Sequence, residues 1–178
     1  TTVPEYIDAI RSSVDARRCF TATYVHFHTI NIIHRDVRAR DTFARLDVLA
    51  PDGIAIMWGA RLLGHRVQRA NNMVMEYAMP RLAELAVARG WSFFLLGSEP
   101  GVAERAAAEL RRAFPGIAIA GTHHGRIQSE GENESIVAEI RTLQPTIVLV
   151  GMGKPRQEEG IVKHKGVRGG GGKRGVGG

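Results

Sequence analysis

One stretch near the end of the chain constrains the fold more than any other: residues 144–159, QPTIVLVGMGKPRQEE. Residues 146–150 are β-prone and uncharged. The segment 151–155 that follows must end a strand, because glycine permits sharp turns and proline cannot continue a ladder. An uninterrupted apolar strand is typical of parallel sheets covered by helices on both faces. Ligands of such sheets bind at the carboxyl ends of the strands, which is where this loop would lie.

The rest of the chain alternates between strand-like and helix-like segments. Strands are expected at residues 21–27, 46–50, 91–96, 117–120 and 146–150. Helices are expected at about residues 4–17, 32–43, 54–63, 73–89, 102–113 and 132–143. Pro80 is expected to kink or divide one helix, and Val102, Ala106, Leu110 and Ala113 are expected to face inward on another. This order predicts an α/β fold of the Rossmann-like, doubly wound type, with a mainly parallel sheet and helices on both faces.

Charge and composition divide the chain into a core domain, residues 1–162, and a basic glycine-rich tail, residues 163–178. The whole chain carries a formal charge of +6, but the tail has five Lys and Arg residues and no acid, which leaves +6 − 5 = +1 for the core. We expect the tail to be disordered because glycine loses much entropy on ordering and buries no side chain. A nearly neutral core without a recognised motif argues against a nucleic-acid partner, although tail-mediated binding is an alternative.

Cys19 is the single cysteine of the 178 residues, so no intrachain disulfide can form and a reducing compartment is expected. The sequence has neither a signal-peptide pattern nor an apolar run long enough to span a membrane. We therefore expect a cytoplasmic protein, and attachment to the inner face of the plasma membrane remains open.

Asp52 is the strongest candidate for chemistry. It follows a predicted strand and precedes Gly53, so its carboxylate would stand at a strand's carboxyl end and could act as a general base. The alternative is that Asp before Gly serves a turn or caps the next helix. Thr29 and Asn31 follow an earlier strand and offer neutral hydrogen bonds to a sugar or base, with helix capping as their alternative.

Several further residues could bind an anionic substrate. Gly97 begins a strand-to-helix turn whose free N–H groups would favour a phosphate, although no GxGxxG or Walker pattern is present. Gly151 and Gly153 belong to the loop that opened this section. The polar and basic candidates are Arg69, Lys154, Arg156 and Gln157, whose alternative is an ordinary solvated surface. His123 and His124 are adjacent, a poor arrangement for chelation from one strand, so no metal site is predicted.

Together these segments resemble the WecG/TagA/CpsF family of bacterial glycosyltransferases over about residues 1–162. The matching segments are Thr29-Ile-Asn31, Pro51-Asp-Gly53, Phe94-Leu-Leu-Gly97, Pro100-Gly-Val-Ala103, Phe114-Pro115, Gly121-Thr-His-His-Gly125 and the segment VGMGKPRQE at residues 150–158. The resemblance implies transfer of a sugar of the N-acetylmannosamine, N-acetylmannosaminuronic acid or glucose class from a UDP-sugar to a polyprenyl-diphosphate-linked saccharide. The pathway would build a cell-surface polysaccharide or teichoic acid.

The resemblance also implies roles for individual residues. Asp52 would be the base of an inverting reaction, and Thr29, Asn31 and Gln157 would position donor and acceptor. Arg69 would offset charge on the departing diphosphate, and no cofactor or catalytic metal would be needed.

This chain departs from the family pattern in two places. Residues 69–73 read RANNM, with Asn where relatives generally have Gly before an acidic residue. Relatives also continue past residue 158 with a helical segment associated with membrane attachment, in place of the glycine tail. We therefore keep a truncated, noncatalytic UDP-sugar-binding domain as the alternative function, with a surface exposed for self-association into a homo-oligomer.

Overall fold

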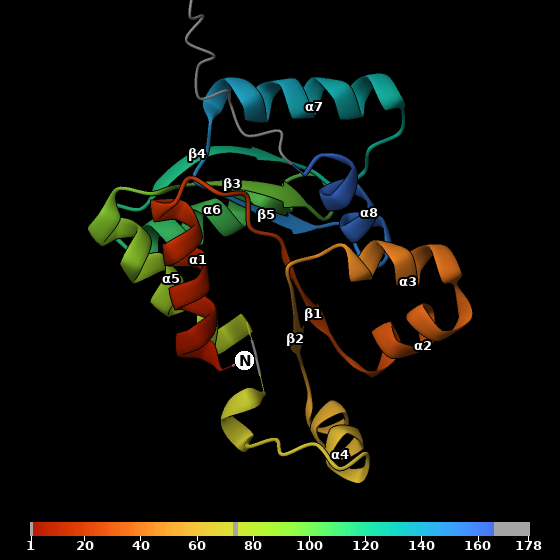
Figure 1. Cartoon of the computed structure of the whole chain (residues 1–178). Coiled ribbons are helices and arrows are strands. Elements are labelled where there is room, and N and C mark those ends of the chain that lie inside the picture. Colours follow the sequence, from red (N-terminus) through yellow and green to blue (C-terminus); the bar gives the residue numbers. More distant parts are fainter. Residues whose placement is uncertain (1, 73–74, 166–178) are drawn as a thin grey trace, which may run out of the picture.

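The computed structural model describes residues 2–72 and 75–165, in which strands and helices alternate along the chain (Figure 1). The strands are β1 (Ala22–Val25), β2 (Val48–Pro51), β3 (Ser92–Gly97), β4 (Ala118–His123) and β5 (Ile147–Gly151). The helices are α1 (Val3–Asp15), α2 (Phe27–Arg35), α3 (Val37–Ala44), α4 (Ile54–Leu62), α5 (Met75–Arg89), α6 (Val102–Ala113), α7 (Glu130–Leu143) and α8 (Arg156–Lys163), with a 3-10 turn, η1 (Arg69–Asn71), before α5. The predicted α/β fold is confirmed.

The strands form two parallel sheets rather than one. β1 pairs with β2, and β3 lies between β4 and β5. Helix α6 carries the chain from β3 to β4, and α7 carries it across β3 to β5 on the other side. This reversal of direction is the mark of a doubly wound sheet, and ligands of such sheets bind at the strand ends beside it.

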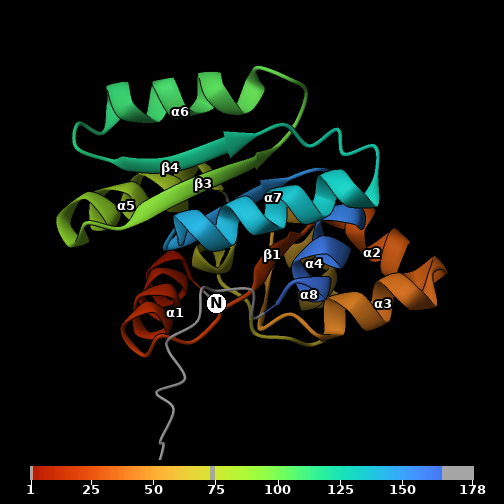
Figure 2. The same ribbon diagram turned by 90° about the horizontal axis from the view of Figure 1, so that it is seen from above.

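Helices cover both faces of the three-stranded sheet. Figures 1 and 2 show α7 over one face, with α5 and α6 on the other side. Phe93 and Phe94 are neighbours in β3 and therefore point to opposite faces, yet both are 0% exposed. The central strand is thus buried on both faces, as the apolar strand pattern predicts.

One hydrophobic core joins the two sheets. Tyr6 and Ile10 of α1 pack with Ala50 of β2, with Leu82 of α5 and with Phe93 of β3. A smaller cluster of Phe43, Leu46 and Val162 packs α3 against α8. Because α8 follows β5, this second cluster attaches the loop after β5 to the helices that flank β1 and β2.

The chain segment after β1 differs from the prediction. The strand ends at Val25 and α2 begins at Phe27, so Thr29 and Asn31 lie within a helix and not in a loop after the strand. Aromatic and β-branched residues suggested a longer strand, but these residues also fit a helix when one face of it is buried. Thr29 is on the buried face and Asn31 is exposed.

Helix α5 continues through Pro80 as one element, so division into two helices is wrong. Proline removes a single backbone hydrogen bond, that to the carbonyl of Glu76, while the buried Ala78, Leu82 and Ala83 hold the helix on the core.

The predicted tail begins at residue 163, but its first residues belong to the fold. Helix α8 ends at Lys163, whose Nζ lies 2.5 Å from Oε1 of Glu130, and Lys165 lies 3.1 Å from Oδ2 of Asp47. The disorder predicted for the rest of the tail concerns residues 166–178, which lie outside the described part. Among the helices of the described residues, none combines the length and apolar character needed to cross a bilayer.

Candidate functional site

Asp52 lies immediately after β2, where the two parallel strands of the smaller sheet end together. Its backbone N–H donates to the carbonyl of Val25, the last residue of β1, at 2.9 Å. Gly53 follows with φ +95°, and its N–H donates to Oδ1 of Asn72 at 2.7 Å. The backbone is therefore fixed on both sides of Asp52, which is partly exposed. Within residues 2–72 and 75–165 its carboxylate has no hydrogen-bonding side chain, so it is available to a substrate.

Two tyrosines lie on the core side of Asp52. Burial, the neighbouring Tyr6 and the charge of Asp52 all raise the pKa of Tyr24. Burial also raises the pKa of Tyr6, whose ring centroid lies 6.2 Å from that of Tyr24. Both hydroxyls therefore stay protonated, and that of Tyr24 donates to Sδ of Met75 at 3.2 Å. A neutral, partly buried phenol, that of Tyr24, therefore lies near the Asp52 carboxylate.

A cavity of about 840 Å³ lies near this strand end: Gly53 is hydrogen-bonded to one of its lining residues, Asn72, but Asp52 itself does not line it. It lies between the start of α1, the helix α4 that follows Asp52, and the segment from η1 into α5. Its walls are mostly apolar, with two arginines and the Asn72 side chain that holds Gly53. The lining residues are Thr2, Val3, Pro4, Ile54, Met57, Trp58, Arg61, Ala70, Asn72, Tyr77 and Arg81. A cavity of this size is large enough for a small ligand.

Gly97 and Gly151 meet where β3 and β5 end, and they are paired in the strand register. A Cβ atom on Gly97 would lie 2.4 Å from the carbonyl oxygen of Gly151, and Gly97 has φ +153°. The next residue, Ser98, donates its N–H to that same carbonyl at 2.8 Å and accepts from the N–H of Gly125 at 2.8 Å. Both predicted glycines are thus used in close backbone packing, and Gly151 remains exposed at the strand end.

The loop after β5 and the first turn of α8 contain a buried charged network. Oε1 of Glu158, a residue that is 0% exposed, accepts from Thr23 at 2.6 Å, from Lys154 at 2.8 Å and from Gln157 at 2.8 Å. Lys154 also donates to Oγ1 of Thr23 at 2.7 Å, and its ammonium lies 5.8 Å from the ring centroid of Phe43. Lys154 and Gln157, both predicted to bind substrate, are therefore brought together by Glu158. The network connects the loop after β5 to β1 of the other sheet.

The remaining predicted residues are more dispersed. Thr29 is 0% exposed, and its hydroxyl lies 3.3 Å from Nδ1 of His26. Gly153 is exposed with φ +82°, and Arg156 is exposed and donates to the carbonyl of Ile127 at 2.6 Å. The backbone of Arg69 lies in η1, and its side chain falls outside the described part.

The sequence prediction missed Thr23, Tyr24 and Glu158. Glu158 could have been found, because it stands four residues after Lys154 at the start of a helix, a spacing that favours an ion pair. Thr23 and Tyr24 carry no such signal, since their roles depend on the contact between β1 and distant segments.

Comparison with known proteins identifies a matching family and several relatives. The model of the glycosyl transferase WecG/TagA/CpsF family matches residues 1–178. The N-acetylglucosaminyldiphosphoundecaprenol N-acetyl-beta-D-mannosaminyltransferase of Staphylococcus aureus strain NCTC 8325 is 42% identical to the chain over 72 residues. Proteins of the same name from strains COL and N315 match with the same identity and length. The matched stretch is 40% of this chain and 27% of each relative, so it spans about a quarter of the relatives' length.

Proposed function

Because the chain belongs to the WecG/TagA/CpsF family of glycosyl transferases, we propose that it transfers an N-acetylmannosamine-class sugar from UDP to an N-acetylglucosaminyl-diphosphate-polyprenol. The names of the Staphylococcus aureus relatives support this donor sugar over its uronic acid or glucose, and they name the diphospho-undecaprenol acceptor. The product would enter the synthesis of a cell-surface polysaccharide.

The observation that carries the proposal is the position of Asp52. Asp52 stands at the carboxyl end of β2 and is partly exposed, and the cavity lined by Ile54, Trp58 and Arg61 begins two residues further along the chain. In the proposed step an acceptor hydroxyl attacks the anomeric carbon, its proton passes to Asp52, and the bond from that carbon to the UDP oxygen breaks. The electron pair leaves on the diphosphate. Attack opposite the leaving group inverts the anomeric centre, which gives a β-linked product from an α-linked donor.

The roles proposed for other residues follow from the family resemblance. Thr29, Asn31 and Gln157 would position the two substrates, and Arg69 would offset charge on the diphosphate. The proposal assigns neutralisation of the diphosphate charge to the guanidinium of Arg69 and requires no metal.

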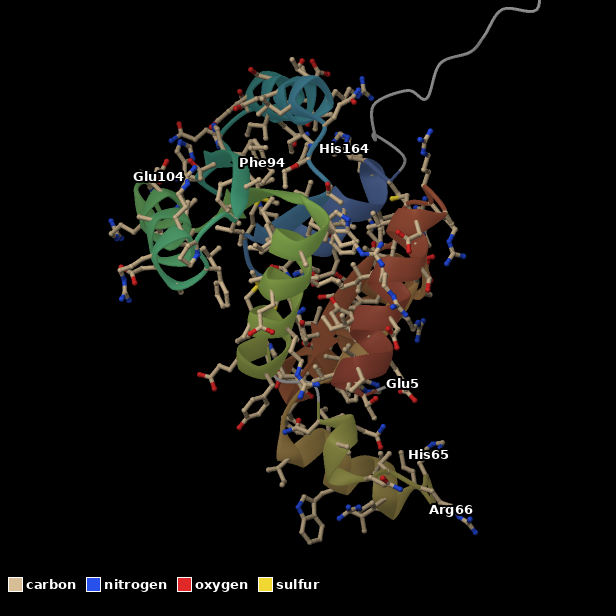
Figure 3. The ribbon with its side chains drawn as sticks, turned by 90° about the vertical axis from the view of Figure 1, so that its left-hand side faces the viewer. Glu5, His65, Arg66, Phe94, Glu104 and His164 are labelled. Carbon is tan, nitrogen blue, oxygen red and sulfur yellow. The ribbon has the colours of Figure 1, made fainter. Side chains whose placement is uncertain are left out.

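Helix α4 supports attachment to a membrane surface, where a polyprenyl acceptor would lie. Ile54, Trp58 and Leu62 recur every fourth residue on one side of the helix and are 63%, 61% and 85% exposed. Arg61 is in the last turn, and Figure 3 shows Arg66 at the tip of the segment that follows, away from the rest of the molecule. Tryptophan beside basic residues suits the interface of an anionic bilayer. Cosedimentation with anionic but not with zwitterionic vesicles is the expected result.

The proposed chemistry is tested by measuring transfer of radiolabelled sugar from UDP-N-acetylmannosamine to a polyprenyl-diphosphate-N-acetylglucosamine analogue, alongside UDP binding. Asp52→Asn should lower the transfer rate by about 10²–10⁴-fold with UDP affinity kept, because the amide cannot accept the proton. Asp41→Asn, at an exposed aspartate of α3, is the matched control and should leave both quantities unchanged.

Each other outcome overturns a different part of the proposal. Transfer at the wild-type rate by Asp52→Asn would remove Asp52 as the base. UDP binding without transfer by the wild-type chain would favour the alternative of a noncatalytic UDP-sugar-binding domain. Absence of both would leave the family membership and the fold without this activity.

A further inference from the structure

A second group of chemically reactive side chains lies at the end of β4, in a different sheet from Asp52. His123 is the last residue of β4, His124 follows it, and Glu132 lies in the first turn of α7. Each offers a ligand atom, and these three atoms lie within 4.8 Å of one another. All three residues are partly buried, which distinguishes them from solvated surface groups.

Adjacent histidines predict no metal site, but the conformation after β4 removes the reason for that prediction. Successive side chains of a regular strand point to opposite faces, so adjacent histidines should diverge. Here the strand ends at His123, and the two imidazole centroids are 4.4 Å apart with ring planes tilted by 50°. The turn after β4 therefore brings the rings together.

The hydrogen bonding of His123 fixes which ring nitrogen is free. Its Nδ1 lies 2.7 Å from the carbonyl oxygen of His124. A carbonyl oxygen only accepts, so Nδ1 carries the proton and Nε2 keeps its lone pair. Histidines that bind metals are commonly oriented in this way, with the other ring N–H given to a backbone carbonyl or a carboxylate.

His124 and Glu132 contribute two further features. Nδ1 of His124 is buried and has no hydrogen-bond partner within the described residues, which is costly unless some ligand satisfies the ring. Glu132 is held in place because its Oε2 accepts from the N–H of Gln128 at 2.8 Å, while its own N–H donates to Oγ of Ser129. The carboxylate is thus positioned by α7 and has its other oxygen to offer.

We propose that His123, His124 and Glu132 bind one divalent cation of the zinc class. Two imidazoles and one carboxylate are a ligand set that suits zinc, with a fourth position left for water. Ligands at 2.0–2.2 Å from a tetrahedral ion lie about 3.4 Å apart, and the three ligand atoms are within 4.8 Å of one another, so small side-chain movements suffice for binding. The bound ion ties the end of β4 to the first turn of α7, and it takes no part in the step assigned to Asp52.

Binding of the metal itself is the test. Untagged protein, freed of metal by dialysis against a chelator, is titrated with Zn²⁺ by calorimetry and with Co²⁺ by visible absorption. One ion per chain, a tetrahedral Co²⁺ spectrum and a raised melting temperature in Zn²⁺ but not in Mg²⁺ are the expected results.

Two variants distinguish a loss of metal binding from a general loss of stability. In His123→Asn the amide N–H₂ can keep the bond to the His124 carbonyl while Nε2 is lost, and in Glu132→Gln the side chain still accepts from Gln128. Each should weaken Zn²⁺ binding by at least about tenfold while the metal-free melting temperature stays close to that of the wild type. His28→Asn is the matched control. His28 is exposed and also has a second histidine nearby, His26, at 6.1 Å between ring centroids, but it belongs to no part of the proposed metal site. Stoichiometric binding retained by both variants, or lost in the control, overturns the proposal, as does the absence of binding by the wild type.

Discussion

Removal of the Glu158 carboxylate is expected to be among the most damaging single substitutions in the chain. Glu158 is 0% exposed and the side chain of Lys154 is 12% exposed, so the pair is nearly shielded from water. In Glu158→Ala the Lys154 ammonium loses its counter-charge, and Thr23 and Gln157 lose the acceptor at 2.6 and 2.8 Å. Breaking a buried ion pair by deleting one partner costs about 3–5 kcal/mol, and we expect a loss of that size.

The loss of stability in Glu158→Ala should arise because the Lys154 ammonium is left buried without a counter-charge, rather than because a strongly favourable ion pair is lost. One oxygen of Glu158, Oε2, is buried without a partner in the described part of the chain, so the pair already carries a desolvation cost. Lys154 lies over the Phe43 ring, and Phe43 packs with Val162 in an apolar cluster. A double substitution, Lys154→Met with Glu158→Leu, should therefore cost less than either Lys154→Met or Glu158→Ala alone.

The free energy of unfolding of all three variants and of the wild type is measured by urea titration, with tryptophan fluorescence as the signal. A double variant that is less stable than either single variant, or a cost below about 1 kcal/mol for Glu158→Ala, would refute a shielded and coupled pair. The folded double variant also tests the prediction that Lys154 binds a diphosphate. Unchanged UDP affinity in that variant would assign Lys154 to the structure of the loop alone.

Two smaller perturbations test the close packing where β3 and β5 end and the hydrogen bonds where β1 and β2 begin. Gly97→Ala should destabilise the protein by about 3 kcal/mol in urea unfolding because the new Cβ meets the Gly151 carbonyl, whereas Gly59→Ala, in α4 with nothing within 4 Å, should be neutral or stabilise by up to about 1 kcal/mol. A Gly97→Ala protein as stable as the wild type would contradict the close packing. The second perturbation concerns Asp47. Burial raises the pKa of its carboxyl group, but hydrogen bonds from Thr21 outweigh this effect and lower the pKa below its ordinary 3.8. The ionised Asp47 therefore stabilises the fold above pH 3.8, and this stabilisation is lost as the pH falls below that value. The difference in the free energy of unfolding between wild type and Asp47→Asn should consequently shrink in acid.

The alternation of elements and the strand ends could be predicted from sequence because they depend on local patterns. Runs of β-prone residues followed by Gly or Pro marked where β2, β3 and β5 end, and Asp52 lies where that pattern placed it. The division into two sheets could not be predicted, since pairing between strands depends on contacts between segments far apart in the chain.

Helix α6 shows a limit of periodicity within a correctly predicted element. Ala106 and Ala113 were expected to face inward, yet both are exposed, and Ala103 and Ala107 are buried instead. Residues 106–108 are three consecutive alanines, which give no local signal of which one faces inward, and the packing of the helix on β3 and β4 decides between them. The pattern found the helix but not its orientation.

The site residues also differ in whether local sequence or tertiary contacts determine their environment. The position of Asp52 follows from the end of its own strand, but the environment of Lys154 depends on Thr23, which lies 131 residues earlier in the sequence. A lysine in a glycine-bearing loop resembles a phosphate ligand until its partner is known. Local sequence therefore indicated which residues reach the strand ends, and tertiary contacts decide which of them remain free for a substrate.

Because the proposed site takes residues from both sheets, the buried network of Thr23, Lys154 and Glu158 helps to position them relative to one another. Asp52 follows β2 of one sheet, whereas Gly151 and Gln157 come from β5 and the helix after it. Backbone pairing holds each sheet together and the two hydrophobic clusters join the sheets, while hydrogen bonds from the loop after β5 to β1 run through Thr23, Lys154 and Glu158. The position of Asp52 relative to that loop therefore depends in part on polar side-chain contacts that a single substitution can remove. A substitution in this network would alter the geometry of the proposed site even if no network atom touched a substrate.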